Sequence, residues 1–269
     1  MDYQTFEPST PLNSFVKCYW TLHAPKENTR EKQRIVPDGC MEMIFHYGDL
    51  YKQYDTNGKH IIQPRCFVFG QITTTLEIEP TGDTRIFAVR FQPDGFTPFS
   101  SLPLKAIENR AVPLHEFFSE EAEELEIKIV NAPTTTHRIQ LVESFLMERL
   151  VSPQAIDRII NSSVKTILDS KGKLSVTALT EATTITRRQL ERRFSTIIGL
   201  SPKQLAKIIR LQSAITLMLN NDFENLTSLA YDSDYFDQAH FIKDFKEFTG
   251  VSPTKFYAGQ LKMSTLFAK

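Results

Sequence analysis

The apolar positions in the second half of the chain follow one spacing twice. Leu190-(x3)-Phe194-(x4)-Gly199-x-Ser201-Pro202 recurs as Phe241-(x3)-Phe245-(x4)-Gly250-x-Ser252-Pro253, and all five positions are offset by 51 residues. A spaced pattern that combines two apolar anchors, a glycine and a Ser-Pro pair does not readily repeat by chance. The sequence therefore predicts a tandem repeat of one supersecondary unit.

Each copy predicts two short helices joined by a sharp turn. In the first copy Thr186 can cap the second helix, and Gln189 completes a capping box, which satisfies two otherwise unpaired backbone donors. Asp237 takes the capping position in the second copy. Gly199 and Gly250 stand where the helices must end with a positive φ, and the Ser-Pro pairs then begin new helices. Two helices at such a turn are typical of a helix-turn-helix.

A long helix is predicted between the two copies, over Pro202–Leu219, because apolar residues recur there at helical spacing without a break. At about 1.5 Å per residue, this segment makes a rigid spacer of roughly 27 Å. Successive major grooves on one face of DNA lie about 34 Å apart. One chain could therefore set two recognition helices into adjacent grooves.

The faces of the two recognition helices that cannot be buried are the candidate DNA contacts. Arg and Gln carry donors that match guanine and adenine edges in the major groove, whereas Lys and His suit phosphates. The second helix has fewer charges, which predicts that it positions the protein more than it specifies a sequence. The alternative is a plain solvated surface. The candidates are Arg187, Arg188, Glu191, Arg192 and Ser195 in the first copy and Gln238, Ala239, His240, Ile242 and Lys243 in the second.

The region from Asp157 to the C-terminus resembles the DNA-binding domain of AraC/XylS-type transcriptional regulators. The most specific part of the resemblance runs from Tyr235 to Pro253, where Phe-Asp-Gln-Ala-His-Phe-Ile-Lys-Asp-Phe-Lys follows Tyr235. The resemblance implies two helix-turn-helix units joined by a long helix, double-stranded DNA as the partner, and RNA polymerase as a candidate second partner. The family usually has Gly in each inter-helix turn, where this chain has Thr184 and Asp234. Asp tolerates the left-handed conformation, and Thr adopts it less readily.

The first half alternates short apolar and β-branched runs with turn signals about every ten residues, which predicts a β-barrel or a sandwich. A barrel ahead of this DNA-binding domain is similar to the cupin-like sensor half of the same family. The predicted fold class is therefore α+β multidomain, with a cupin-like β-barrel and following helices over 1–152 and an all-α domain over 153–269. The predicted strands are Phe15–His23, Arg34–Val36, Met41–Tyr47, Cys66–Phe69, Ile72–Glu79 and Arg85–Gln92.

Two helical patterns follow the predicted barrel. Ser119–Val130 opens with a Glu-rich turn, which is favourable at a helix N-terminus. His137–Val151 has one apolar stripe, and Ser152-Pro153 ends the pattern and marks the domain boundary. The stripe either packs on the barrel or pairs with its copy in a homodimer, which would couple two half-sites. It consists of Ile139, Val142, Leu146 and Leu150.

The composition, with 41% hydrophobic and 23% charged residues, is typical of a globular protein. The chain has no 18-residue apolar run, and its first residues lack the features of a signal peptide. Its three cysteines are scattered and do not suggest a disulfide framework. We therefore expect a cytoplasmic protein without membrane insertion. Residues 157–269 carry 16 Lys and Arg against 11 Asp and Glu, and residues 1–156 carry 15 against 21, so only the C-terminal half suits a polyanion.

The lumen of the predicted barrel is the candidate site for an unknown small-molecule effector. Three plainer explanations stay open: the aromatic residues fill the core, Asp38 only shapes a Pro-Asp-Gly turn, and Arg90 points outward from its strand. The candidate ligand-binding residues are Trp20, Asp38, Glu42, Phe45, Phe69 and Arg90.

The sequence predicts neither a catalytic nor a metal site. Metal-dependent cupin enzymes need clustered ligands, whereas His23, His46 and His60 are singly spaced, and no nucleophile-elbow, P-loop or dinucleotide motif is present. We therefore expect no cofactor and no enzyme, but a sequence-specific DNA-binding regulator that responds to an effector. The rivals are a cupin-like enzyme with an accessory DNA-binding module, and a regulator whose barrel is a ligandless protein-interaction module.

Overall fold

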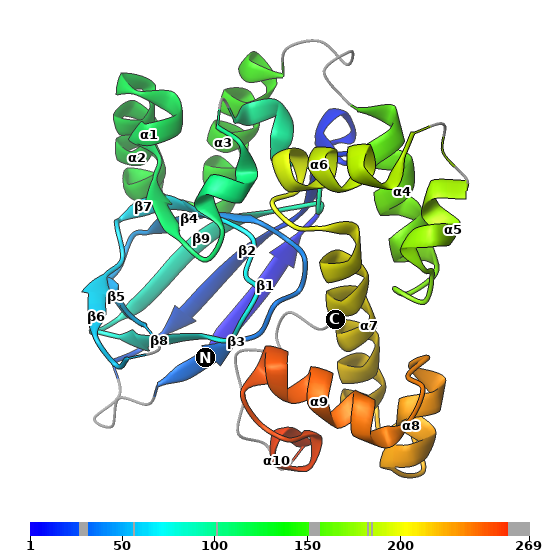
Figure 1. Cartoon of the computed structure of the whole chain (residues 1–269). Coiled ribbons are helices and arrows are strands. Elements are labelled where there is room, and N and C mark those ends of the chain that lie inside the picture. The colour runs from blue at the N-terminus through cyan, green and yellow to red at the C-terminus, as the bar shows by residue number, and fades with distance from the viewer. Residues whose placement is uncertain are drawn as a thin grey trace.

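The computed structural model describes residues 1–26, 32–55, 57–100, 102–150, 157–181, 183 and 185–257. Its N-terminal part contains two β-sheets and the helices α1 to α3, and its C-terminal part contains the helices α4 to α10 (Figure 1). The order of strands followed by helices confirms the predicted α+β class. Within the described residues, no helix combines the length and the apolar character needed to cross a membrane.

The strands form two antiparallel sheets. One has the order β1-β2-β9-β4-β7-β10 and the other the order β3-β8-β5-β6. The strands are β1 (Asp2–Phe6), β2 (Val16–Ala24), β3 (Gln33–Ile35), β4 (Glu42–His46), β5 (Tyr51–Tyr54), β6 (His60–Ile62), β7 (Cys66–Phe69), β8 (Leu76–Pro80), β9 (Thr84–Phe91) and β10 (Ala111–Pro113). Short 3-10 turns lie at Thr10–Leu12 (η1), Thr97–Phe99 (η2) and Leu104–Ile107 (η3).

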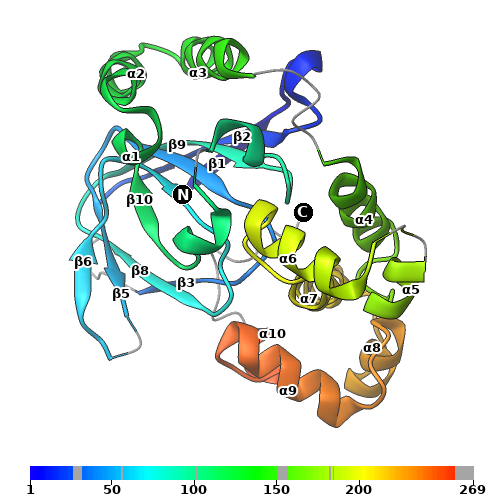
Figure 2. The ribbon, with the colours of Figure 1, turned by 45° about the horizontal axis from the view of Figure 1, so that its top comes forward.

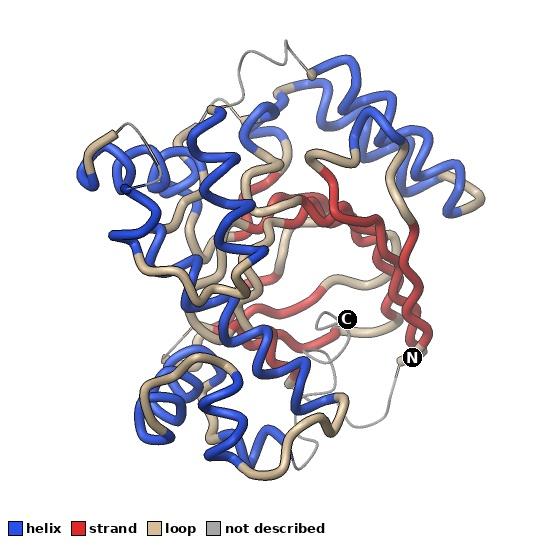
Figure 3. The backbone as a smooth tube through the Cα atoms, turned by 90° about the vertical axis from the view of Figure 1, so that its right-hand side faces the viewer, coloured by secondary structure: helices blue, strands red, loops and turns tan. Residues whose placement is uncertain are grey.

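The expected closed barrel is wrong, because the two sheets stay open and face each other (Figure 3). In the described residues β1 pairs only with β2, β10 only with β7, β3 only with β8 and β6 only with β5. The edge strands β3, β6 and β10 have three residues each, which leaves little backbone to continue the hydrogen-bonded ladder. The N-terminal part is therefore a sandwich of two open sheets.

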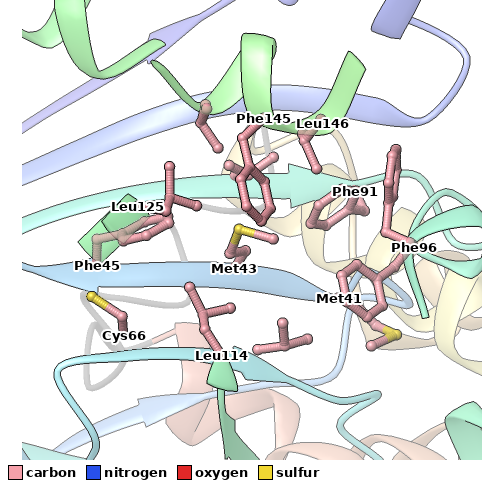
Figure 4. Packing of buried hydrophobic residues seen from close by; sticks show 14 of the residues in the cluster. Met41, Met43, Phe45, Cys66, Phe91, Phe96, Leu114, Leu125, Phe145 and Leu146 are labelled. Atoms are coloured by element: carbon pink, nitrogen blue, oxygen red, sulfur yellow. The ribbon is translucent and has the colours of Figure 1, made fainter. Parts of the chain in front are cut away.

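Side chains of the six-stranded sheet alternate between two separate cores. Met43, Phe45 and Phe91 point to one face, where they pack beneath the helices (Figure 4). Trp20 and Ala88 point to the other face, toward the four-stranded sheet. This alternation follows from the two-residue period of a strand. It gives three layers, which are helices, a large sheet and a small sheet.

The helices α1 (His115–Phe118), α2 (Glu120–Asn131) and α3 (Thr135–Arg149) cover the outer face of the large sheet (Figure 2). The stripe of α3 packs inward: Val142 and Leu146 are fully buried in the core of this sheet, and Ile139 and Leu150 pack against it. Of the two alternatives for this stripe, packing within the N-terminal part is thus correct and the homodimer contact is wrong. A sheet face rich in Phe needs an apolar cover, and the α3 stripe provides it.

The C-terminal helices confirm the predicted pair of helix-turn-helix units. α5 (Val176–Glu181) and α6 (Arg187–Ile197) form the first unit, α8 (Leu226–Asp232) and α9 (Gln238–Thr249) form the second, and α7 (Pro202–Leu219) joins them. α4 (Arg158–Asp169) and α10 (Pro253–Tyr257) complete the domain. One core holds both units together, with α7 through its centre and Leu190, Phe194, Phe241 and Phe245 packed on it.

Candidate functional site

The first recognition helix, α6, is fixed at its start by the predicted capping box. The Thr186 side chain accepts a hydrogen bond from the Gln189 backbone N–H, and the Gln189 side chain accepts one from the Thr186 backbone. Leu190 and Phe194 are fully buried, so the opposite face of the helix must be exposed. That face presents Arg188 and Arg192 to solvent.

Ion pairing separates the arginines of α6 into two classes. Arg187 pairs with Glu191 at 2.9 Å, and Arg193 pairs with Asp157, the residue that caps α4, at 3.1 Å. Among the described residues, no ion pair involves Arg188 or Arg192. In the described part of the chain, these two guanidinium groups therefore have no carboxylate to release before they bind an anion. Ser195, the remaining candidate on this helix, is half-buried.

The second recognition helix, α9, has a less charged exposed face. Asp237 caps it by accepting a 2.7 Å hydrogen bond from the His240 backbone N–H. Ala239, His240 and Lys243 are exposed. Gln238 is half-buried and accepts a 3.2 Å hydrogen bond from the Thr227 hydroxyl, which holds it beside α8.

Two further α9 side chains are drawn toward the protein. Ile242 is half-buried and packs against the helical core. The His240 ring lies 3.6 Å from the buried Asp244 carboxylate, which also pairs with Lys207 of α7 at 3.0 Å. The structure thus leaves Lys243 as the most plainly available cation among the α9 candidates.

The turns between the paired helices agree with the sequence where they are described. Asp234 adopts the left-handed conformation with a φ of 60°, as expected for the position where the family usually has Gly. Gly199 and Gly250 end the recognition helices with φ values of 83° and 72°. The first turn residue, Thr184, lies outside the described residues, as does the predicted boundary at Ser152-Pro153.

The two recognition helices run in the same direction on the same side of the protein. In Figure 1, α6 and α9 both have their C-terminal ends toward the sheets and their N-terminal ends away from them. Residues of the N-terminal part contact the C-terminal ends of both helices: the Thr97 hydroxyl donates to the Ile197 carbonyl of α6 at 2.8 Å, and the Thr75 hydroxyl donates to the Phe248 carbonyl of α9 at 3.0 Å. The N-terminal halves, which carry the predicted base contacts, remain open.

An exposed aromatic side chain beside α9 was not anticipated from the sequence. Phe236 exposes 85% of its surface and directly precedes the capping residue Asp237. Its neighbour Tyr235 is buried. Both residues precede the first residue of α9, Gln238, so the helical periodicity did not indicate which ring would be exposed.

A second candidate site is an internal cavity of about 60 Å³ between the two sheets. Five of the six predicted ligand-binding residues line it: Trp20, Asp38, Glu42, Phe69 and Arg90. The prediction for the sixth residue, Phe45, is corrected, because Phe45 is fully buried in the core on the other face of its sheet. Glu42, Ile44 and His46 of β4 point to the cavity, so the residue between Ile44 and His46 must point away.

One end of the cavity holds a buried cluster of three charges. Arg90 forms an ion pair with Asp38, and its guanidinium lies 3.5 Å from the Glu42 carboxylate. The Trp20 indole N–H donates a 3.0 Å hydrogen bond to the same Glu42 oxygen. Burial raises the pKa of Glu42 to about 7. Arg90 therefore points inward, and Asp38 is more than a turn residue.

The other end of the cavity is formed by His46, which the sequence did not single out as a ligand. It is 1% exposed, and its Nε2 atom lies 3.3 Å from the Gln63 side-chain oxygen. Burial lowers the pKa of His46 to about 4, so the ring is neutral at pH 7. Its Nδ1 atom is buried and has no hydrogen-bond partner within the part of the chain that the structure describes.

The segment Val36–Cys40 touches the cavity on one side and the helical domain on the other. Asp38 and Cys40 line the cavity. Val36 belongs to the helical core, and the Pro37 carbonyl accepts a 2.7 Å hydrogen bond from the Gln212 side chain of α7. Gly39 approaches α7 so closely that an added Cβ would lie 3.0 Å from Leu205.

Comparisons with known proteins agree with this architecture. Residues 4–113 match a family described as a domain of unknown function, DUF6597, and residues 179–258 match a family described as a helix-turn-helix domain. An uncharacterized HTH-type transcriptional regulator of Haemophilus influenzae is 26% identical over 152 residues, which are 54% of this chain and 51% of that protein. The chain thus matches about half the length of this curated relative.

Solved structures show likeness along almost the whole chain. ToxT from Vibrio cholerae is similar with a TM-score of 0.51 at 12% identity, covering 89% of this chain and 98% of that one. A structure of ToxT from Vibrio cholerae O395 bound to (E)-4-(8-methylnaphthalen-1-yl)but-3-enoic acid has a TM-score of 0.49 at 13% identity, covering 96% and 99%.

Within the described residues, no group of three or more His, Cys, Asp and Glu side chains is placed to hold a metal ion. The structure shows two capped helix-turn-helix units in the C-terminal half. The family match to a helix-turn-helix domain covers the same region. The sheet-rich half ahead of it matches a family of its own. The C-terminal part of the chain is a helix-turn-helix domain of the kind that AraC/XylS-type transcriptional regulators carry.

Proposed function

We propose that this chain regulates transcription by binding a specific double-stranded DNA sequence with α6 and α9, and that a small-molecule effector in the cavity controls this binding. The observation that carries the proposal is the parallel placement of two open recognition helices on α7 (Figure 1). At about 1.5 Å per residue, α7 is roughly 27 Å long, which suits major grooves about 34 Å apart once the helix diameters are added.

The two recognition helices have different tasks in this proposal. Arg188 and Arg192 are exposed without an ion-pair partner among the described residues, and guanidinium forks match the acceptors of guanine. α9 offers Lys243 and the half-buried Gln238. A lysine contact to phosphate fixes the register of the protein without reading bases. α6 thus specifies the sequence and α9 positions the domain.

The effector acts through the segment Val36–Cys40. Asp38 belongs to the charge cluster of the cavity, whereas Pro37 is bonded to Gln212 of α7. A molecule that changes the Arg90–Asp38 ion pair therefore has a direct path to the helix that sets the spacing of α6 and α9. Such coupling requires that the ligand bind two arrangements of this segment with different affinity.

The remaining assignments complete the proposal. The chain acts by binding rather than by catalysis, in the cytoplasm, with residues 1–152 as the sensor domain and 153–269 as the DNA-binding domain. RNA polymerase is a further partner. A homodimer stays part of the proposal, but its contact surface is not the α3 stripe, which is buried on the large sheet.

The test is selection of binding sites from a pool of random DNA duplexes by the full chain. We expect one recurrent sequence that spans about two successive major grooves. The double variant Arg188→Ala and Arg192→Ala should lose the enrichment while it keeps the melting temperature, because both side chains are exposed. If the unaltered protein enriches no sequence, the proposed function is wrong.

A further inference from the structure

The charged residues that line the cavity balance one another only while Glu42 keeps its proton. Three charged residues line it: Asp38, Glu42 and Arg90. Arg90 forms an ion pair with Asp38 and also contacts Glu42 at 3.5 Å. One guanidinium cannot neutralise two carboxylates, and a buried charge without compensation is costly. The cluster is therefore one positive charge short when both carboxylates are ionised.

Accessibility shows which carboxylate meets an occupant of the cavity. The Glu42 side chain exposes 19% of its surface, Asp38 exposes 14% and Arg90 only 5%. The Arg90 guanidinium is thus nearly inaccessible, whereas Glu42 is the most open member of the cluster. Lys17 lowers the pKa of Glu42 through charge, but Lys17 does not line the cavity. A positively charged group inside the cavity would meet Glu42 first.

The opposite end of the cavity is formed by His46, whose Nδ1 atom is buried without a partner in the described residues. The Gln63 amide nitrogen donates to Gln53 at 3.4 Å, so the Gln63 oxygen faces His46 and accepts from its Nε2–H. The neutral ring then carries its lone pair on Nδ1, which is buried without a partner in the described residues. A buried acceptor that makes no hydrogen bond costs free energy, and a ligand donor would remove that cost.

The two ends lie on one face of one strand. Glu42 and His46 are four residues apart on β4, with Ile44 between them, which corresponds to roughly 13 Å along the strand. Apolar residues form most of the remaining lining and include Ile35, Leu76 and Ile86. A cavity of about 60 Å³ admits a narrow molecule and not a bulky one.

We propose that the cavity binds a narrow organic cation, with an ammonium group at Glu42, an apolar chain along Ile44, and a hydroxyl or N–H donor at His46. This inference rests on the effector site of the proposed function and names the chemical class of its ligand. Ammonium binding supplies the missing positive charge of the cluster. It also favours the ionised form of Glu42, whose pKa burial has raised to about 7.

The test uses three molecules of equal length that differ in charge at one end: 5-amino-1-pentanol, pentane-1,5-diol and 5-hydroxypentanoate. Trp20 is the single tryptophan of the chain and lies in the cavity, so its fluorescence reports occupancy. Calorimetric titration of the full chain measures the affinities. We expect the amine to bind at least tenfold more tightly than the diol, and the carboxylate to bind most weakly. Amines of three to six carbons define the length that fits.

Two variants locate the binding groups. Glu42→Gln keeps an acceptor for the Trp20 indole but removes the charge, and it should lower the affinity of 5-amino-1-pentanol at least tenfold. His46→Phe keeps a ring between Tyr51 and Phe67 but removes Nδ1. It should weaken 5-amino-1-pentanol severalfold and leave 1-aminopentane, which lacks the hydroxyl, unchanged. Ile127→Ala, on the exposed face of α2, is the control that alters neither affinity.

Two outcomes would overturn the inference: tighter binding of 5-hydroxypentanoate than of the amine, or no binding of any amine of the series. If Glu42→Gln does not fold, the order of the three molecules on the unaltered protein still decides. The titrations contain no DNA, so a failure of ligand binding is separate from a failure of the random-duplex selection.

Discussion

The Gln212 side-chain amide donates a 2.7 Å hydrogen bond to the Pro37 carbonyl, across 175 residues of sequence. Gln212 lies near the middle of α7, and Pro37 adjoins the cavity residue Asp38. The bond ties the helix between the two recognition units to the segment that closes the charged end of the cavity. The Asp38–Arg90 ion pair therefore involves the residue next to Pro37, which contacts α7 directly.

The Gln212→Ala variant removes the hydrogen bond between α7 and Pro37. Loss of one half-buried hydrogen bond costs about 0.5–1.5 kcal/mol of unfolding free energy, measured in urea. The same variant should reduce the effect of a cavity ligand on DNA affinity, because the Pro37 contact is gone. Lys203→Ala, on an exposed position of α7, serves as the stability control. An unchanged ligand effect in Gln212→Ala would show that coupling takes another route.

Replacing different arginines of α6 should have different effects on DNA binding and on stability. Arg188→Ala or Arg192→Ala should cost about 1–3 kcal/mol of DNA-binding free energy and relax the preference at particular base pairs. Arg193→Ala is the matched control on the same helix, because its guanidinium pairs with Asp157 at the start of α4. It should lower the melting temperature slightly and keep the base preference. Uniform weakening on all sequences would reduce Arg188 and Arg192 to phosphate contacts.

Glu42 should make stability depend on pH in a defined direction. Burial raises its pKa from 4.5 to about 7, so between these values the folded protein keeps a proton that the unfolded chain releases. The contribution of this group to stability therefore falls as the pH rises through that window. Glu42→Gln removes the effect, and its unfolding free energy relative to the unaltered protein should rise by about 1–3 kcal/mol from pH 5 to pH 8.

The contribution of His46 to stability changes with pH in the opposite direction to that of Glu42. Burial lowers its pKa from 6.5 to about 4, so its contribution to stability grows as the pH rises between those values. Only the difference between Glu42→Gln and the unaltered protein isolates Glu42, because the His46 contribution cancels in it. A difference that stays flat from pH 5 to pH 8 would mean that Glu42 ionises in the fold as readily as in the unfolded chain.

Charges placed on the α3 stripe should unfold the N-terminal part. Val142 and Leu146 are both fully buried under the large sheet. Val142→Glu together with Leu146→Glu buries two unpaired carboxylates, and we expect a loss above about 4 kcal/mol, visible as collapse of the β signal in circular dichroism. Ile127→Glu, at a side chain that is 63% exposed on α2, should stay folded. A folded, monomeric double variant would contradict the packing.

The C-terminal domain could be read from the sequence because its signals are local. The Thr186–Gln189 capping box, the glycines at positive φ and the repeated apolar anchors each act within a few residues. The N-terminal sandwich depends on pairing between distant strands instead. β1 is mostly polar and exposed, so it has no apolar alternation to recognise. β6 and β10 have three residues each, and such short strands do not show a two-residue period.

Five of the six predicted ligand-binding residues line the cavity, but the sequence did not show which face of each strand lines it. Trp20, Glu42 and Arg90 were found as aromatic and charged residues within strands, but the sequence could not tell which strand face would meet the second sheet. His46 shares its face with Glu42, and Phe45 takes the other face. A charged residue in a strand normally indicates the solvent side, and here the Arg90–Asp38 ion pair allows it to be buried.

The last prediction is that α9 positions the protein more than it specifies a sequence. Among its candidate residues the available cation is Lys243, whereas Gln238 is held by Thr227 and Ile242 packs on the core. Each neutralised phosphate adds about 0.9 to the salt slope of binding, so Lys243→Ala should lower that slope by about one and weaken all sites alike. Lys128→Ala, an exposed lysine on α2, should leave the slope unchanged. In sites selected from random duplexes, one sharp block beside one diffuse block would agree with this division of tasks. Two equally sharp blocks would mean that Gln238 leaves Thr227 and reads an adenine as selectively as Arg192 reads a guanine.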